Sequence, residues 1–279
     1  MLLRAVPLGS PGSVLPAGVC TPGELERAAA ILEPVRSHEF LAGRLALRAL
    51  VAEAAGTDPR LVLPAYTCPD CGRGEHGAPG FVLAASAHDG GARLPLPGPG
   101  RLLPVAASMS RAGGWALLAA EVTPCGAEVA PCGAEVAPCG AEVAPCGAEV
   151  APCGAEVAPC GAEVAPCGAE VTPCGAEVAG FVQGLGVDVA AVADFRTAIP
   201  DALFSAAERR RAAKAAEPAR EAARIWARKE ALLKALGSGL RGDPQSIETL
   251  EDPRVRDINP AALGLPPGFV AAVAQTRRS

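Results

Sequence analysis

The stretch PAREAARIWARKEALLKALGSG, residues 218–239, is the most strongly helical segment of this 279-residue chain. Pro218 suits the first turn of a helix, and Gly237 suits the position that ends one. Between Pro218 and Gly237, apolar residues at helical spacing predict one buried face, formed by Ile225, Trp226, Leu232, Leu233 and Leu236. We therefore expect a helix from residue 218 to residue 236 that packs against a core.

Two charged residues lie at the edge of that apolar face. Glu230 follows Trp226 by four residues and precedes Leu233 by three, so its carboxylate is expected at the border of the core. Lys234 lies one turn further along the same side. The common interpretation of such a pair is a weak surface ion pair, and the helix taken alone favours it.

A seven-residue repeat lies upstream of the helix. Eight copies of EVAPCGA run from Glu121 to Ala176, and they differ only at Thr123 and Thr172. Each copy has a proline, which costs about 3 kcal/mol inside a helix, and a glycine two residues later, so a coiled coil is excluded. We expect flexible or weakly ordered chain, with a stacked solenoid of turns as the alternative. The near-identity of the copies favours recent tandem duplication over a demand of the fold.

Most of the 11 cysteines belong to the repeat. Only Cys20, Cys68 and Cys71 lie outside it, and scattered cysteines of this kind are typical of reduced thiols. Prolines interrupt the first residues, and no run of about 18 apolar residues occurs, so we expect a cytoplasmic protein without a signal peptide or membrane span. Cys68, Cys71 and His76 supply only part of a zinc site, so a plain loop is expected there.

The charge balance differs between the repeat and the rest of the chain. The repeat holds eight of the 30 acidic residues and none of the 25 basic ones. The remainder therefore has a small positive excess, which suits an anionic ligand or an acidic partner. The basic segment AERRRAAK, residues 207–214, has no aromatic residues around it that could stack on bases, so no nucleic acid is expected as a partner.

The chain on either side of the repeat has the pattern of strands. WALLAA, residues 115–120, is a short apolar run, and LGVDVA, residues 185–190, places Val187 and Val189 around one acid. We expect these two runs to pair as a hairpin with the repeat as its overgrown loop. Lengthening such a loop to about 60 residues costs only about 2 kcal/mol of closure entropy, so the fold can accommodate it.

GVD at residues 186–188, followed by WARKEALLKALGSG at residues 226–239, closely resembles the signature of the Sfp-type 4′-phosphopantetheinyl transferases. That signature reads G-[VI]-D and then W-x-x-K-E-[AS]-x-x-K-x-x-G-x-G, and every fixed residue of its second part is present. Other segments also resemble that family: Arg36 with FLAGRLALRAL (40–50), CPDCGRGEHGAPG (68–80), SMSRAGG (108–114), FSAAE (204–208) and PPGFVAAVA (266–274). The resemblance covers nearly the whole chain outside the repeat.

The resemblance implies an α+β fold of two similar, pseudo-twofold halves, each a small antiparallel sheet with a long helix, and an active site between them. We expect the N-terminal half at residues 1–120, the repeat insertion at 121–176 and the C-terminal half, with the metal and catalytic residues, at 177–279. The implied enzyme is a monomer of the holo-[acyl-carrier-protein] synthase type. It transfers 4′-phosphopantetheine from coenzyme A to a serine of an apo acyl or peptidyl carrier protein, releases adenosine 3′,5′-bisphosphate and requires Mg²⁺.

The resemblance also assigns roles to single residues. Asp188, Glu230 and Lys234 form the expected catalytic set. Asp188 and Glu230 would hold Mg²⁺, which prefers carboxylate oxygens, and Glu230, or a water beside it, would take the serine proton. Half-burial of Glu230 would raise its basicity. A further set would bind coenzyme A, chiefly through its phosphates: Arg36, Arg44, Arg111, Lys229, Lys234, Ser110 and His76.

Three positions depart from the family pattern. Ala190 stands where many members have a second acid, so a water would fill that metal position. Arg111 stands where a histidine is usual, which keeps a phosphate contact and makes its charge permanent, and Ala78 replaces a cation often found in the H-G-x-P loop. Two alternatives stay open: a relative that binds coenzyme A or a carrier without transfer, and a structural or thiol-buffering protein built around the Cys-rich repeat.

Overall fold

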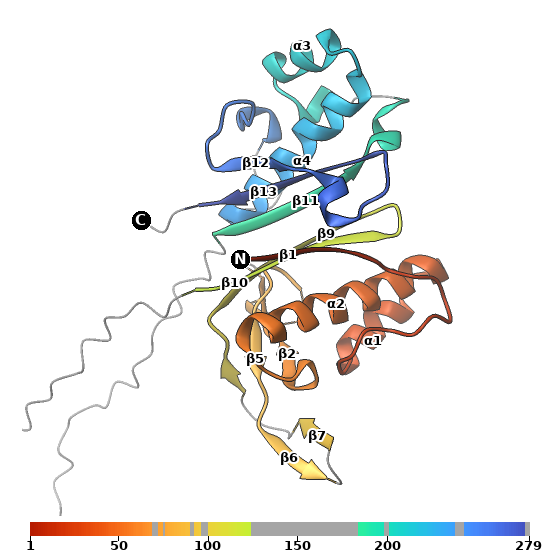
Figure 1. Cartoon of the computed structure of the whole chain (residues 1–279), viewed down its shortest axis with the longest axis vertical. Helices are drawn as coiled ribbons and strands as arrows, with labels where there is room; N and C mark the ends of the chain where they lie inside the picture. Colours follow the sequence, from red (N-terminus) through yellow and green to blue (C-terminus); the bar gives the residue numbers. More distant parts are fainter. Residues whose placement is uncertain are drawn as a thin grey trace, which may run out of the picture. The chain divides into compact units, whose positions relative to one another are not determined.

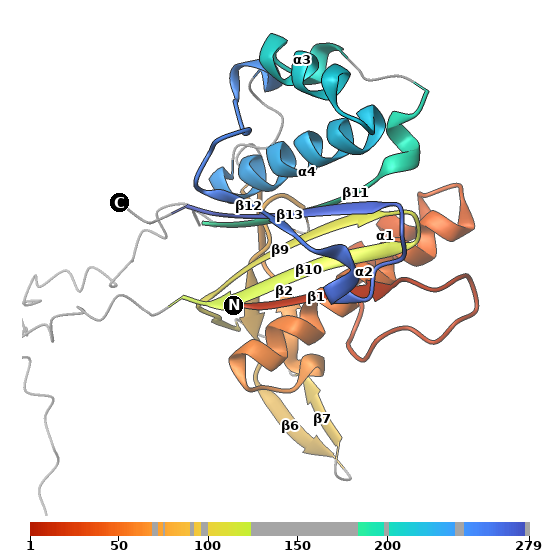
Figure 2. The same cartoon turned by 45° about the horizontal axis from the view of Figure 1, so that its top comes forward.

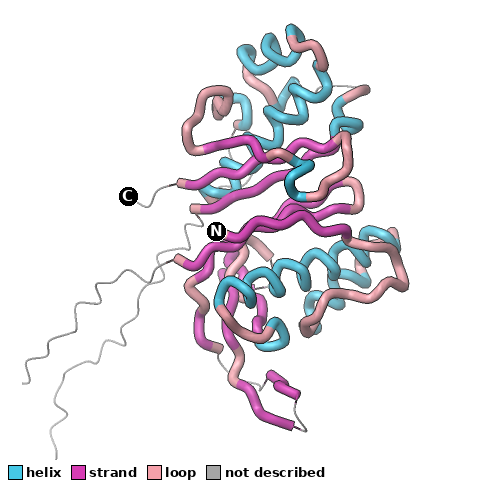
Figure 3. The backbone as a smooth tube through the Cα atoms, viewed as in Figure 1, coloured by secondary structure: helices cyan, strands magenta, loops and turns pink. Residues whose placement is uncertain are grey.

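The computed structural model describes residues 1–68, 72–74, 76–89, 92–95, 100–123, 184–197, 201–237 and 243–276. Met1–Thr123 and Ala179–Ser279 form one compact unit. Within the described part of this unit, two of the three-stranded antiparallel sheets lie between two long helices (Figure 1 and Figure 3). The predicted mixture of helices and antiparallel sheets is therefore confirmed.

The two sheets share one strand order. In the first, β1 (Leu2–Pro7) and β9 (Val105–Ala112) flank the central strand β10 (Trp115–Val122). In the second, β11 (Leu185–Ala191) and β12 (Val255–Ile258) flank the central strand β13 (Phe269–Gln275). In both sheets the last strand along the chain therefore lies between the other two.

Helices follow the first strand of each sheet. In the N-terminal half these are α1 (Pro22–Ala29) and α2 (Pro34–Ala55), and in the C-terminal half α3 (Ala206–Lys214) and α4 (Pro218–Leu236). Short strands extend the N-terminal half: β2 (Val62–Pro64), β3 (Tyr66–Cys68), β4 (Gly72–Gly74), β5 (Phe81–Leu83), β6 (Ser86–Asp89), β7 (Ala92–Pro95) and β8 (Arg101–Leu102). Short 3₁₀ helices complete the connections: Pro59–Leu61, Val192–Phe195, Asp201–Leu203, Pro244–Ser246 and Pro260–Leu263.

The predicted helix is confirmed at both ends. It begins at Pro218, and Gly237 ends it in the left-handed conformation with φ 71°. The predicted apolar face needs one correction, because the side chain of Leu236 is exposed. Ala231 and Ala235 are fully buried and face β11 at this end of the helix instead.

The core is divided by the two-residue alternation of the central strands. In β10, Ala116 and Leu118 pack toward α2, whereas Leu117 packs toward the other sheet. In β13, Ala272 packs toward α4, whereas Val273 packs toward the first sheet. Successive side chains of a strand point to opposite faces, so each sheet buries both faces. The result is four layers, in the order helix, sheet, sheet and helix (Figure 2).

The predicted hairpin between residues 115–120 and 185–190 is wrong. β10 pairs with β1 and β9, whereas β11 pairs with β13 in the other sheet. The tight hairpin is formed by β9 and β10, whose turn residues Gly113 and Gly114 have φ 52° and 77°. Such values favour glycine at both turn positions. The apolar pattern of residues 115–120 and 185–190 does not indicate which strand each of them pairs with.

The start of the predicted repeat insertion overlaps a strand. Glu121 and Val122, the first residues of the predicted insertion, are the last two residues of β10. Residues 124–176 of the repeat lie outside the described residues, and the three predicted segments stay a prediction. None of the helices in the described ranges is long and apolar enough to cross a membrane.

Candidate active site

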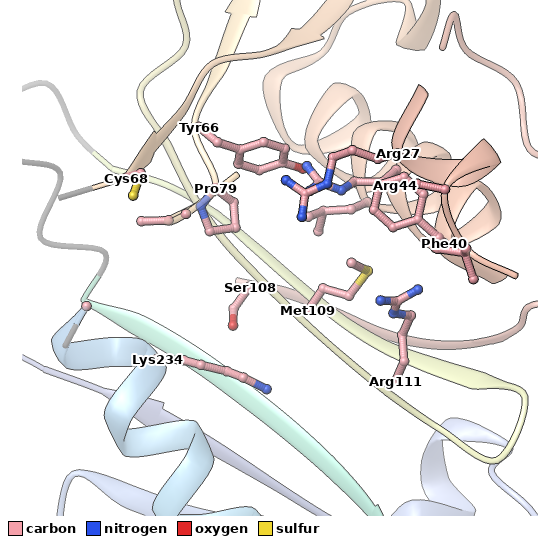
Figure 4. A pocket seen from close by; sticks show the side chains of 16 residues that line it. Arg27, Phe40, Arg44, Tyr66, Cys68, Pro79, Ser108, Met109, Arg111 and Lys234 are labelled. Atoms are coloured by element: carbon pink, nitrogen blue, oxygen red, sulfur yellow. The ribbon is translucent and has the colours of Figure 1, made fainter. Parts of the chain in front are cut away.

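A cationic pocket of about 810 Å³ lies beside β9 in the N-terminal half. Figure 4 shows four basic side chains around it: Arg27 from α1, Arg44 from α2, Arg111 from β9 and Lys234 from α4. The other lining residues are largely apolar and include Ile31, Phe40, Leu47, Tyr66, Pro79 and Met109. This combination suits a ligand with several negative charges and an apolar portion.

Aromatic rings support two of these arginines. The Arg44 guanidinium carbon lies 4.1 Å from the centre of the Tyr66 ring and 5.2 Å from that of Phe40. The Arg111 carbon lies 5.9 Å from the same Phe40 ring. Burial lowers the pKa of Arg111, an effect that Glu39 opposes and Arg44 adds to. The guanidinium groups of Arg44 and Arg111 therefore lie in a partly desolvated environment, where they would attract an anion strongly.

A second, acidic pocket of about 510 Å³ adjoins the first, because Arg111 and Lys234 line both. Its carboxylates are those of Asp188 on β11, Glu230 on α4 and Asp194, which follows β11. The structure therefore brings together the three predicted catalytic residues, although Asp188 and Glu230 are 42 positions apart in the sequence.

Asp188 is the most buried of these acids. Its Oδ1 accepts hydrogen bonds from Ser110 Oγ at 2.6 Å and from Lys234 Nζ at 2.7 Å. Burial raises the pKa of Asp188, while Lys234 and Ser110 oppose that rise. Ser110 and Ser108 lie on the face of β9 that meets β11, and Ser108 Oγ accepts the Val187 N–H at 3.0 Å. The two serines thus fix the edge strand that carries Asp188.

Glu230 lies at the border of the helix face, as the sequence predicts. Its side chain is 16% exposed, and Oε2 lies 4.0 Å from Lys234 Nζ. Oε1 is buried and has no hydrogen-bond partner among the described residues. Burial raises the pKa of Glu230; Lys234 opposes this and Asp188 adds to it. The predicted gain in basicity is therefore confirmed in direction.

The donor set fits a magnesium ion that is shared with a ligand. Both carboxylates approach the single Lys234 ammonium, and the free Oε1 of Glu230 offers a further oxygen. No group of three or more His, Cys, Asp or Glu side chains within the described ranges could hold a metal by itself. Mg²⁺ usually takes one or two carboxylates and completes its shell with phosphate and water. Asp188 and Glu230 meet that requirement.

Lys229 lies apart from both pockets. Its ammonium donates to Glu208 Oε2 and to the Pro244 carbonyl, both at 2.6 Å, and the Lys229 and Glu208 side chains are 0% exposed. The structure therefore favours a structural role for Lys229 over the predicted contact with the phosphates of coenzyme A. The reason is geometric: successive helix residues point about 100° apart, so Glu230 faces the pocket while Lys229 faces the α3 side.

The remaining residues singled out from the sequence differ in where they lie relative to the two pockets. Arg36 is 77% exposed, pairs with Glu33 and does not line either pocket. His76 is half-buried outside the lining, although the next three residues, 77–79, contribute to the cationic pocket. Ala190 is buried against α4 and offers no acid. Cys71 lies outside the described residues, so the partial zinc motif stays untested.

Several lining residues were missed from the sequence. Phe40 lies one helical turn before Arg44, and Met109 lies two strand residues before Arg111, so both share a face with a predicted residue. That spacing could have found them. Arg27 and Asp194 line their pockets because the tertiary fold places them there, and no local sequence pattern indicates this.

Residues 184–262 match the family model of the 4′-phosphopantetheinyl transferase superfamily. No curated protein matches the chain significantly. The matched segment contains β11, α3, α4 and the acids Asp188 and Glu230. The similarity to this superfamily therefore covers the segment that carries both candidate metal ligands, and it supports phosphopantetheine transfer in general terms.

Proposed function

We propose that the protein transfers 4′-phosphopantetheine from coenzyme A to a serine of an apo acyl or peptidyl carrier protein, with Mg²⁺ at Asp188 and Glu230. The observation that carries this proposal is the junction of the two pockets. Lys234 and Arg111 line both the cationic pocket and the acidic pocket. A diphosphate held at that junction would lie between arginines on one side and carboxylates on the other.

The binding roles follow from charge and placement. Arg44 and Arg111 would hold phosphates of coenzyme A, and Arg27 lies in the same pocket. Phe40 and Tyr66 fix the arginine side chains by ring contacts, which limits the entropy lost on binding. Bound Mg²⁺ would supply a centre that gathers phosphate oxygens and spreads their negative charge.

The transfer step needs a proton acceptor. The carrier serine oxygen forms a bond to the phosphorus next to the pantetheine arm, and the bond from that phosphorus to adenosine 3′,5′-bisphosphate breaks. The serine proton goes to Glu230 directly or through a water. Oε1 of Glu230 is buried without a partner among the described residues, and burial raises its pKa. Both features suit a general base.

We also propose that the two halves are related by a pseudo-twofold axis, as in the Sfp-type enzymes. The shared strand order supports this relation. A buried pair recurs as well: Glu24 meets Arg48 at 2.6 Å and Glu208 meets Lys229 at 2.6 Å, and each glutamate belongs to the capping box of the short helix.

Release of adenosine 3′,5′-bisphosphate tests the proposed function. Chromatography of a mixture of the protein, coenzyme A, Mg²⁺ and an apo carrier is expected to show this product, and a carrier whose serine is replaced by alanine is expected to give none. Equal release without a serine would indicate hydrolysis and contradict transfer. Calorimetric binding of coenzyme A with no product at high Mg²⁺ would instead support a binding-only relative, the alternative that Ala190 favours.

A further inference from the structure

We propose that Lys234 is an internal counter-cation of the acidic pocket, which Mg²⁺ must displace, and that coenzyme A assists this displacement by drawing the lysine toward its phosphates. This inference rests on the proposed function and adds a coupling between the two ligands. Lys234 then has two positions: against Asp188 in the free protein, and toward the cationic pocket in the complex.

The position of the ammonium is the first support. Lys234 Nζ donates to Asp188 Oδ1 at 2.7 Å and to the Val187 carbonyl at 3.2 Å, and it lies 4.0 Å from Glu230 Oε2. It therefore lies among the same oxygens that a metal would use. Two carboxylates so close together repel each other, and this ammonium neutralises one of their two charges.

The incomplete satisfaction of Glu230 is the second support. The lysine reaches Asp188 at hydrogen-bond distance but leaves Glu230 Oε1 without a partner among the described residues. A doubly charged ion would balance both carboxylates, whereas one ammonium balances only one. In the free protein, the Lys234 ammonium therefore balances only part of the carboxylate charge. This imbalance favours the replacement of the ammonium by a divalent ion.

The location of Lys234 is the third support, because its ammonium can move from the acidic pocket to the cationic pocket. Its side chain lines the acidic pocket and the cationic pocket at once, and Figure 4 shows it extending from α4 toward Ser108 and Arg111. The side chain is 26% exposed, compared with 6% for Asp188. A flexible four-carbon stem lets the ammonium turn toward a phosphate without movement of the helix.

An ordinary structural ion pair is the competing explanation. One joins the first strand to the long helix in the N-terminal half, where Arg4 meets Glu53 at 2.7 Å. Both of those side chains are exposed, at 55% and 42%, so that pair resembles a surface contact of small energy. The Lys234–Asp188 pair differs, because its acid is buried and a second acid lies beside the same ammonium.

The coupling follows from linkage. A phosphate that attracts Lys234 removes the competitor of Mg²⁺, and Mg²⁺ that takes the carboxylates frees Lys234 for the phosphate. Each ligand therefore raises the affinity for the other by the same factor.

Calorimetric titration of the full-length protein with Mn²⁺ as the probe tests this inference. Without coenzyme A, Lys234→Met is expected to bind Mn²⁺ roughly tenfold or more tightly than the wild type. Lys214→Met removes an exposed lysine of α3 and is expected to change nothing. Lys234→Gln provides a second, polar variant, and circular dichroism checks that both are folded.

Equal or weaker Mn²⁺ binding by folded Lys234→Met and Lys234→Gln would overturn the counter-cation role and leave the proposed function standing. Absence of Mn²⁺ binding in every protein, with coenzyme A present as well, would overturn both. A gain in Mn²⁺ affinity on adding coenzyme A that is large in the wild type and smaller in Lys234→Met would confirm the coupling.

Discussion

Lys229→Met distinguishes a structural lysine from a phosphate ligand. The Lys229 and Glu208 side chains are both 0% exposed and 2.6 Å apart, so the variant leaves a buried carboxylate without its counter-ion. The Pro244 carbonyl also loses its Lys229 donor. Removing one partner of a buried ion pair typically costs about 3–5 kcal/mol. We expect the free energy of unfolding to fall by about that amount.

Urea denaturation followed by circular dichroism measures this loss. The double variant Glu208→Gln with Lys229→Met removes both charges and is expected to regain part of the stability. It also keeps the test possible if the single variant does not fold. Its KM for coenzyme A should stay near the wild-type value, because neither residue lines the cationic pocket or the acidic pocket. A stable Lys229→Met protein with a KM raised about tenfold would refute the structural role.

Three further outcomes follow from the geometry. Gly186→Ala is expected to lower the melting temperature, because a Cβ would meet the backbone of Ala231, and overpacking costs about 1–3 kcal/mol; an unchanged melt would contradict this. Burial raises the pKa of Glu230 above its ordinary value, so kcat/KM is expected to increase with pH until this carboxylate is ionised. An acidic limb of the pH profile with an apparent pKa at or below the ordinary value of a glutamate would contradict the role as general base. Calorimetry should show Arg44→Met weakening coenzyme A binding roughly ten- to hundredfold, whereas the control Arg36→Met should not.

The long helix was the most predictable part of the fold. Pro218 and Gly237 are local signals, and a helix depends on local contacts, so its ends could be placed from the sequence. The partners of the strands were not predictable in this way. Residues 185–190 have an apolar pattern that fits any buried strand, and their pairing with β13 rather than β10 is set by contacts far along the chain.

The candidate site was predicted in part for the same reason. Asp188 and Glu230 were found through a motif, and the structure places both beside Lys234. The motif also names Lys229, yet a motif match does not separate residues that contact a ligand from residues with a structural role. Asp194 carries no local signal, because it reaches the acidic pocket only through the turn after β11.

The intact mass of an apo carrier protein tests the central claim most directly. After incubation with the protein, coenzyme A and Mg²⁺, the carrier is expected to gain the mass of one phosphopantetheine group, and Glu230→Gln and Asp188→Asn are expected to slow this gain at saturating coenzyme A by roughly a hundredfold or more. An unchanged mass with acyl and peptidyl carriers alike, or an undiminished gain with both variants, would contradict the account.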